Sequence, residues 1–142
     1  MSQKIKGNCL CGAVTVTSTI DAPILRACHC RMCRQQNSGA YMSISNDPQD
    51  VEVSGDFTLY RSSDWAERAF CPVCGSTLWY GTIADGARHL SAGLFENAAD
   101  APLKLEFFAD LCPAGYGFAG DHKRLNTEQT IALFAPNEGE AQ

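Results

Sequence analysis

Hydrophobic residues alternate with polar ones over short stretches along most of the chain. Between residues 13 and 17, Val14 and Val16 alternate with threonines, which is the pattern of a half-buried β-strand. Similar stretches predict strands over residues 40–45, 51–53, 57–61, 77–80, 87–94, 103–109 and 130–134. Turn-forming Gly, Asp, Asn and Pro residues separate these stretches. The pattern predicts a mainly β domain built from antiparallel sheets.

One stretch, residues 31–37, predicts a short helical turn, and it directly follows a group of three cysteines. The chain of 142 residues has the length of one domain. We expect a single domain over residues 1–135 and a polar tail over residues 136–142.

The charge and the apolar pattern restrict the function. A formal net charge of −5 argues against nucleic-acid binding, because nucleic-acid-binding domains normally carry a basic excess. The first eight residues hold no apolar stretch, and no segment approaches the roughly 20 apolar residues of a membrane span. We therefore expect a cytoplasmic protein without a membrane partner, in which the cysteines stay reduced rather than paired in disulfides.

Two pairs of cysteines predict a structural zinc site. Cys9 and Cys11 are separated by one residue, Cys71 and Cys74 by two, and a glycine that permits a tight turn follows each pair. Neither pair alone satisfies zinc, which prefers four ligands in a tetrahedron, but together they supply four thiolates. The energy of such binding is also folding energy. Ordinary buried cysteines, the alternative interpretation, do not explain two pairs that are each followed by glycine.

A third cluster has a different composition. Cys28, Cys30 and Cys33 supply three sulfurs from one six-residue segment and would leave a fourth position open on a zinc ion, as in catalytic zinc sites. We predict that these three residues are catalytic and hold a second zinc. His29 is poorly placed as the fourth ligand because it lies between two ligating neighbours. Cys112 is the alternative fourth ligand or an ordinary thiol, and an iron–sulfur cluster would need a fourth cysteine nearby.

An open zinc with three thiolates favours a soft ligand such as a thiol. Binding to zinc lowers the pKa of a thiol, which makes it a nucleophile towards an aldehyde carbon. Arg26, Arg31 and Arg34 lie close to the cluster in the sequence. They can hold the carboxylates of an anionic thiol such as glutathione, or form a solvated helix face.

Three cysteine motifs follow one another over roughly residues 7–120. They are Gly7-x-Cys9-x-Cys11-Gly12, Cys28-His29-Cys30-x2-Cys33, and Arg68-x-Phe70-Cys71-x2-Cys74-Gly75. In this order the chain resembles the glutathione-dependent formaldehyde-activating enzyme family, which includes the centromere protein V group. The resemblance implies a β-tent fold, in which twisted antiparallel sheets surround zinc. It also implies a structural zinc on Cys9, Cys11, Cys71 and Cys74 and a catalytic zinc on Cys28, Cys30 and Cys33.

The resemblance further implies a carbon–sulfur lyase of the S-(hydroxymethyl)glutathione synthase type, with two zinc ions per chain. Glutathione and formaldehyde, or a related thiol and a small electrophile, would be its partners. The chain departs from the family pattern at Glu106, where many members carry histidine, and near Gly115, where they carry tryptophan. Two alternatives are a non-catalytic carrier of zinc-bound thiols and a zinc-stabilised interaction module.

Overall fold

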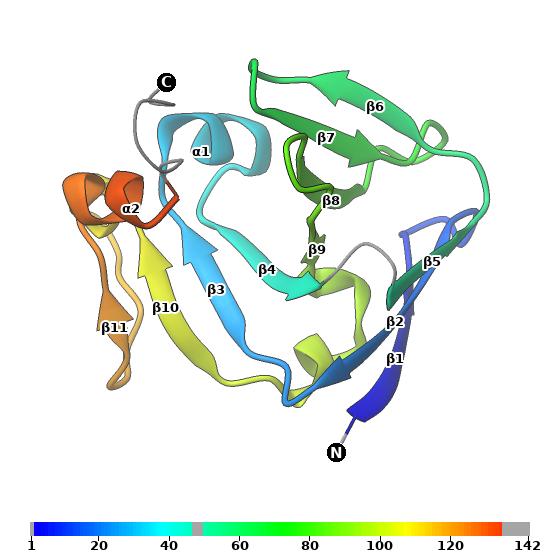
Figure 1. Ribbon diagram of the computed structural model, residues 1–142, viewed down its shortest axis with the longest axis horizontal. Helices are drawn as coiled ribbons and strands as arrows, with labels where there is room; N and C mark the ends of the chain where they lie inside the picture. Colours follow the sequence, from blue (N-terminus) through cyan, green and yellow to red (C-terminus); the bar gives the residue numbers. More distant parts are fainter. Residues whose placement is uncertain (1, 47–49, 135–142) are drawn as a thin grey trace. The chain divides into compact units, whose positions relative to one another are not determined.

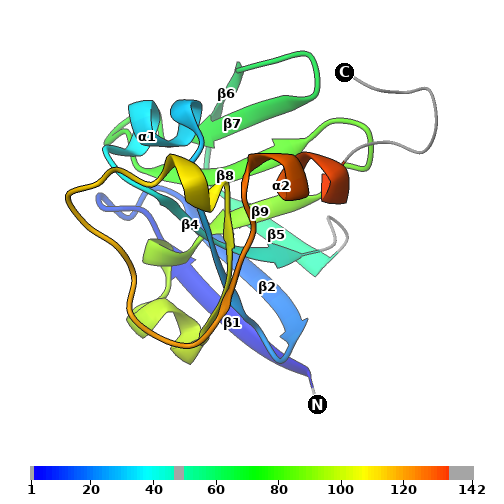
Figure 2. The same cartoon turned by 90° about the vertical axis from the view of Figure 1, so that its left-hand side faces the viewer.

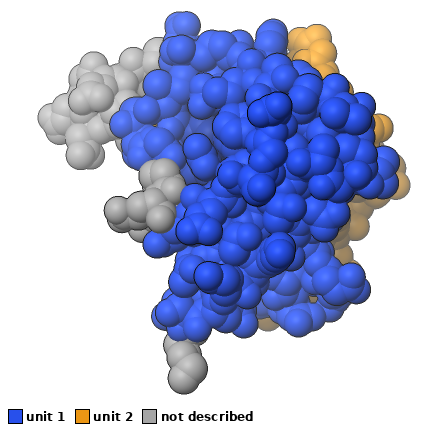
Figure 3. Space-filling view, turned by 90° about the vertical axis from the view of Figure 1, so that its right-hand side faces the viewer, with its two compact units in different colours: residues 1–25, 43–102 blue, residues 26–42, 103–142 orange. Residues whose placement is uncertain are grey.

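Antiparallel β-strands make up most of the regular structure in the computed structural model, which describes residues 2–46 and 50–134 (Figure 1). The chain divides into two compact units, which are coloured separately in Figure 3. The first unit consists of residues 1–25 and 43–102, and the second of residues 26–42 and 103–142. The prediction of a mainly β fold is confirmed.

The first unit contains a three-stranded antiparallel sheet in the order β1-β2-β5. Its strands are β1 (Ser2–Asn8), β2 (Thr15–Asp21) and β5 (Val51–Ser54). Val16 of β2 is fully buried and pairs with Gly7 on one side and Val53 on the other. A Cβ atom at Gly7 would lie 2.2 Å from the backbone oxygen of Leu94. Glycine therefore permits the close approach between β1 and the 3-10 helix η2 (Ala92–Leu94).

The remaining strands of the first unit follow the order β4-β9-β8-β7-β6. They are β4 (Tyr41–Asn46, in this unit from Ser43 on), β6 (Thr58–Arg61), β7 (Ala66–Phe70), β8 (Thr77–Thr82) and β9 (Arg88–Ser91). Leu90 of β9 pairs with Ile44 of β4 and with Trp79 of β8, and all three side chains are buried. The segment η3 (Glu96–Asp100), in which Asn97, Ala98 and Ala99 have left-handed φ and ψ, follows η2. This core holds the β7–β8 turn, which carries two of the cysteines.

The second unit is built around β10 (Leu103–Phe107), which lies between β3 (Leu25–Cys28, in this unit from Arg26 on) and β11 (Lys123–Arg124). Strands β10 and β11 form a short parallel pair. The helices of this unit are α1 (Arg31–Asn37), the 3-10 helix η4 (Ala109–Leu111) and α2 (Thr127–Phe134). The connection over residues 112–122 contains neither a helix nor a strand (Figure 2).

Helix α1 confirms the helical turn predicted over residues 31–37. The strand predicted over residues 130–134 is wrong, because these residues form the second half of α2. Asn126 Oδ1 accepts a hydrogen bond from the Gln129 amide at 2.8 Å, and Gln129 Oε1 accepts one from the Asn126 amide at 2.9 Å. This reciprocal cap starts a helix upstream of the alternating residues. Strands β1, β3, β7 and β11 were not predicted from the alternation.

No helix within the described residues is both long and apolar enough to cross a membrane. The predicted polar tail over residues 136–142 lies outside the described part of the chain.

Candidate metal centres

The two cysteine pairs of the first unit come together. Cys9 and Cys11 follow β1, and Cys71 and Cys74 lie in the turn between β7 and β8. The four Sγ atoms all lie within 4.8 Å of one another. The Sγ atom of Cys11 is 3.7 Å from that of Cys9 and 3.8 Å from that of Cys71. A tetrahedral zinc with Zn–S bonds of about 2.3 Å separates its sulfurs by about 3.8 Å, so the spacing fits this metal.

Backbone geometry prepares both loops for a cation. The amides of Val14 and Cys74 donate hydrogen bonds to the Sγ atoms of Cys9 and Cys71, at 3.3 and 3.5 Å. Desolvation would raise the pKa of Cys9, but hydrogen bonds with the Val14 amide and with the sulfurs of Cys11 and Cys71 leave this pKa lowered. Gly75, which follows the second pair, has a φ of +80°, a conformation that glycine adopts without steric strain. These contacts therefore hold the sulfurs of Cys9 and Cys71 in fixed positions.

The four sulfurs differ in how readily they lose a proton. Hydrogen bonds from the hydroxyl and the amide of Ser76 lower the pKa of Cys74 to about 5. The Ala13 amide would lower the pKa of Cys11, but desolvation and hydrogen bonds with the neighbouring sulfurs raise it to about 11. Sulfurs so close together cannot all ionise unless a cation balances their charge. The donor set therefore fits a divalent metal that prefers thiolates.

The third cluster lies entirely in the second unit. Cys28 ends β3, Cys30 is the N-cap of α1, and Cys33 lies in the first turn of that helix. Their Sγ atoms lie within 4.8 Å of one another. The Cys33 amide donates to Cys30 Sγ at 3.4 Å, which repeats the contact between Cys74 and Cys71. Hydrogen bonds with the other two sulfurs, followed by desolvation, raise the pKa of Cys28.

Within the described residues, no further Cys, His, Asp or Glu places a ligand atom within this range of all three sulfurs. Cys112 belongs to neither cluster, and its thiol donates to the backbone oxygen of Tyr116 at 3.4 Å. The structure therefore brings together the two sets that the sequence predicted. The second set remains one ligand short of the four that zinc prefers.

The arginines near the third cluster differ in their surroundings. Arg34 donates through Nε to the backbone oxygen of His29 at 2.8 Å, so it braces the cysteine segment. Arg31 is exposed on α1. Arg26 is half-buried, and desolvation lowers its pKa. Of the three arginines, Arg31 alone is exposed. An anionic ligand arriving from solvent can therefore reach its side chain.

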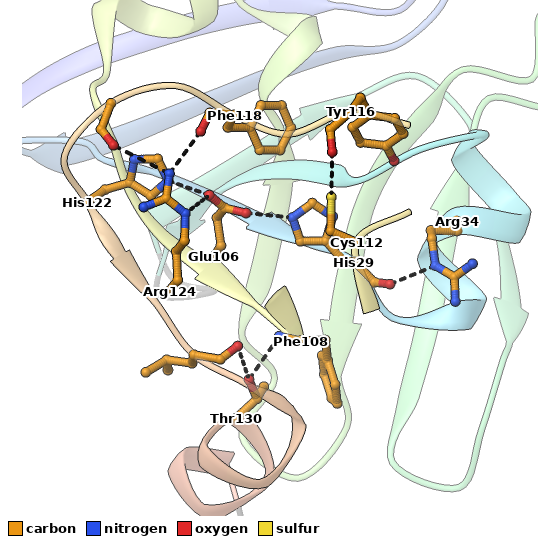
Figure 4. Close-up of polar contacts among 12 residues, drawn as sticks. His29, Arg34, Glu106, Phe108, Cys112, Tyr116, Phe118, His122, Arg124 and Thr130 are labelled. Carbon is orange, nitrogen blue, oxygen red and sulfur yellow. Dashed lines mark hydrogen bonds and ion pairs between the residues drawn. The ribbon is translucent and has the colours of Figure 1, made fainter. Parts of the chain in front are cut away.

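A buried polar network in the second unit was not predicted from the sequence (Figure 4). His29 Nε2 lies 2.7 Å from Glu106 Oε1, and His122 Nε2 hydrogen-bonds to Oε2 of the same carboxylate. Arg124 Nε lies 3.1 Å from that second oxygen. Burial alone would raise the pKa of Glu106, but the hydrogen bonds from both histidines and the charges of His29 and Arg124 leave the pKa lowered. The network joins residue 29, residue 106 and residues 122–124, so no local sequence motif predicts it.

The chain belongs to the glutathione-dependent formaldehyde-activating enzyme family, whose family model matches residues 4–110. An uncharacterized lyase of Schizosaccharomyces pombe (strain 972 / ATCC 24843) is 30% identical over 128 residues, which cover 89% of this chain and 93% of that protein. A Rhodobacter sphaeroides protein of known crystal structure is similar in fold, with a TM-score of 0.57 and 21% identity. The match covers 70% of this chain and all of that one. At this identity the likeness concerns the fold alone.

Proposed function

We propose that this chain is a zinc-dependent carbon–sulfur lyase-type enzyme. It would form or cleave the adduct between a glutathione-like thiol and formaldehyde or a related small aldehyde. The family to which the chain belongs and the lyase name of its yeast relative support this class of activity. The observation that carries the proposal is the cluster of three sulfurs for which the described residues supply no fourth ligand.

The two clusters take different roles in this proposal. Cys9, Cys11, Cys71 and Cys74 hold a structural zinc, because four thiolates close the coordination sphere. Cys28, Cys30 and Cys33 hold the catalytic zinc. When bound there, zinc supplies a Lewis acid with one position open to a soft ligand. Strand β3 ends at Cys28 and helix α1 begins directly after Cys30, so regular structure flanks the segment that would hold this metal.

The reaction balances without a further reagent. The thiol sulfur forms a bond to the aldehyde carbon, the carbonyl π bond breaks, and the thiol proton ends on the aldehyde oxygen. The reverse sequence cleaves the adduct. Arg31, solvated on α1, is the side chain that we assign to a carboxylate of the thiol substrate.

The proposal treats both compact units as one functional domain, because the family match runs through residues of each. Free thiolates need a reducing environment, so we also propose that the protein works in the cytoplasm.

Thiols add to formaldehyde without a catalyst, so only a comparison of rates tests the activity. NMR exchange spectroscopy measures these rates at equilibrium. We expect the native zinc protein to accelerate the exchange of formaldehyde with its glutathione adduct, and Cys30→Ser to lose this acceleration. Equal rates with and without protein, for every thiol tried, would remove the catalytic claim. If calorimetry still detected thiol binding, the chain would be a carrier.

A further inference from the structure

Glu106 is buried in the second unit, with 3% of its surface exposed. Both carboxylate oxygens are engaged: His29 binds Oε1, and His122 and Arg124 bind Oε2. Burying a carboxylate is costly unless charged or polar groups compensate it. Three side chains therefore contact this one carboxylate, and its position affects the segments that carry them.

One partner belongs to the cysteine segment. His29 is fully buried and lies between Cys28 and Cys30. Alternate side chains of an extended segment point to opposite sides, and Cys30 is extended with φ −63° and ψ 160°. His29 therefore points away from the side on which its two neighbours gather. Its amide also donates to the backbone oxygen of Phe107 at 3.1 Å, so both its ring and its backbone are fixed to β10.

Among the residues that the structure describes, Glu106 alone orients the His29 ring by hydrogen bonding. The Nδ1 atom of His29 has no hydrogen-bond partner among the described residues. The ring of Phe118 also lies near the His29 ring, with its centroid 5.6 Å away. Removing the carboxylate would leave both ring nitrogens unpaired in a buried site, which favours movement of the segment.

The same carboxylate is linked through Arg124 to the connection over residues 112–122. Arg124 donates through Nη2 to the backbone oxygens of Phe118 and Gly120, at 2.8 and 3.4 Å. Glu106 therefore holds the arginine that ties this connection down, as well as the histidine on which Phe118 packs (Figure 4).

The network is not a metal site of its own. The ligand atoms of His29, Glu106 and His122 are not among the sets of described residues that lie together within 4.8 Å. Each histidine instead uses Nε2 to bind the carboxylate. Its effect on a metal would therefore be indirect, through the neighbours of His29.

We propose that Glu106 is a positioning residue for the metal site of Cys28, Cys30 and Cys33. This inference rests on the proposed function, because it assigns a metal to the three sulfurs. A metal site with three protein ligands lacks a fourth ligand that would help to fix the other three. The positions of its sulfurs therefore depend more on the backbone of the segment that carries them. Loss of an outer partner that orients a metal site typically weakens metal binding by about 10–100-fold.

Cobalt binding to the full chain tests this role without using turnover, because thiolate-bound Co²⁺ has visible absorption that reports its geometry. We would strip the ion of the three-sulfur site from the zinc-loaded protein with a chelator and refill that site with Co²⁺. The affinity of this second ion is measured by competition with the chelator, and the first ion is the one at the four-cysteine site. We expect Glu106→Ala to weaken the second ion about ten-fold or more and to shift its bands, with the first ion unchanged. Glu106→Gln keeps one acceptor oxygen and should restore part of the affinity. Glu128→Ala, which removes an exposed carboxylate from the same unit, is the matched control.

The outcomes separate this inference from the proposed function. If the native chain binds two ions and both Glu106 variants match it, the positioning role is wrong and the proposed function stands. A lower melting temperature with an unchanged second ion would also overturn it, because that is the effect of a purely structural residue. If the native chain itself binds one ion, at the four-cysteine site, then the proposed function fails and this inference fails with it. Glu106→Gln decides the question if Glu106→Ala does not fold.

Discussion

The Sγ atoms of Cys11 and Cys71 lie 3.8 Å apart although 60 positions separate them in the sequence. The contact joins the loop after β1 to the turn between β7 and β8. A metal bound there would close the long stretch of chain between these two cysteines, and in the unfolded chain no such site is preformed. Its binding energy would therefore contribute directly to folding.

Cys71→Ala should destabilise the protein strongly, because it removes a ligand of the structural metal site that we propose. We expect a loss of more than about 4 kcal/mol in the free energy of unfolding, or no folded protein at all. Denaturant unfolding followed by circular dichroism measures the change. Cys112→Ala removes a thiol outside both clusters and should cost less than about 1 kcal/mol. Equal losses in the two variants would contradict the structural role.

Cys30→Ser should leave a folded protein that carries less metal. A serine hydroxyl can still cap α1 by accepting from the Cys33 amide, so the helix keeps its first turn. A hydroxyl is a poor zinc ligand, so the three-sulfur site should empty. Elemental analysis should then find about one zinc per chain instead of about two. If Cys30→Ser unfolds as readily as Cys71→Ala, the division into structural and catalytic sites is wrong.

Replacing Ala98 by glycine should stabilise the first unit. Residues 97–100 all have positive φ, with a value of +51° at Ala98. An L-residue in this conformation costs about 1–2 kcal/mol, and the greater freedom of glycine in the unfolded chain offsets part of the gain. We expect a net gain of about 0.5 kcal/mol from thermal unfolding. Ala101 has φ −82°, so Ala101→Gly should destabilise the protein instead. A loss at both positions would show that the left-handed turn carries no such strain.

The hairpin between β8 and β9 should respond to acid through Asp85. The Thr82 hydroxyl, then the Ala87 amide, lower the pKa of this carboxyl, and the charge of His89 adds to the effect. A lowered folded-state pKa stabilises the protein above the unfolded pKa of about 3.9, and this stability is lost as the pH falls through the folded value. Asp85→Asn should therefore reduce stability at pH 7 by less than about 1 kcal/mol, because the group is largely exposed.

The difference between Asp85→Asn and the native chain should shrink as the pH falls below about 4. Urea unfolding at several pH values measures it. A difference that stays constant with pH would contradict the role of the charge.

The sequence by itself determined the mainly β class, helix α1 and the membership of both cysteine clusters. These features are visible locally: alternation has a period of two residues, and cysteines that could share a metal ion come in short segments such as Cys71 to Cys74. Neighbouring ligands therefore reveal themselves without knowledge of the fold.

The tertiary structure alone decided what depends on distant partners. Residues 130–134 alternate like a strand but are helical because Asn126 and Gln129 cap the helix upstream. In the sequence Glu106 stands out only as a departure from the family pattern, and folding brings His29 and His122 to its two oxygens. A buried charge is stabilised by the partners that surround it in space, and these partners have no fixed spacing along the chain.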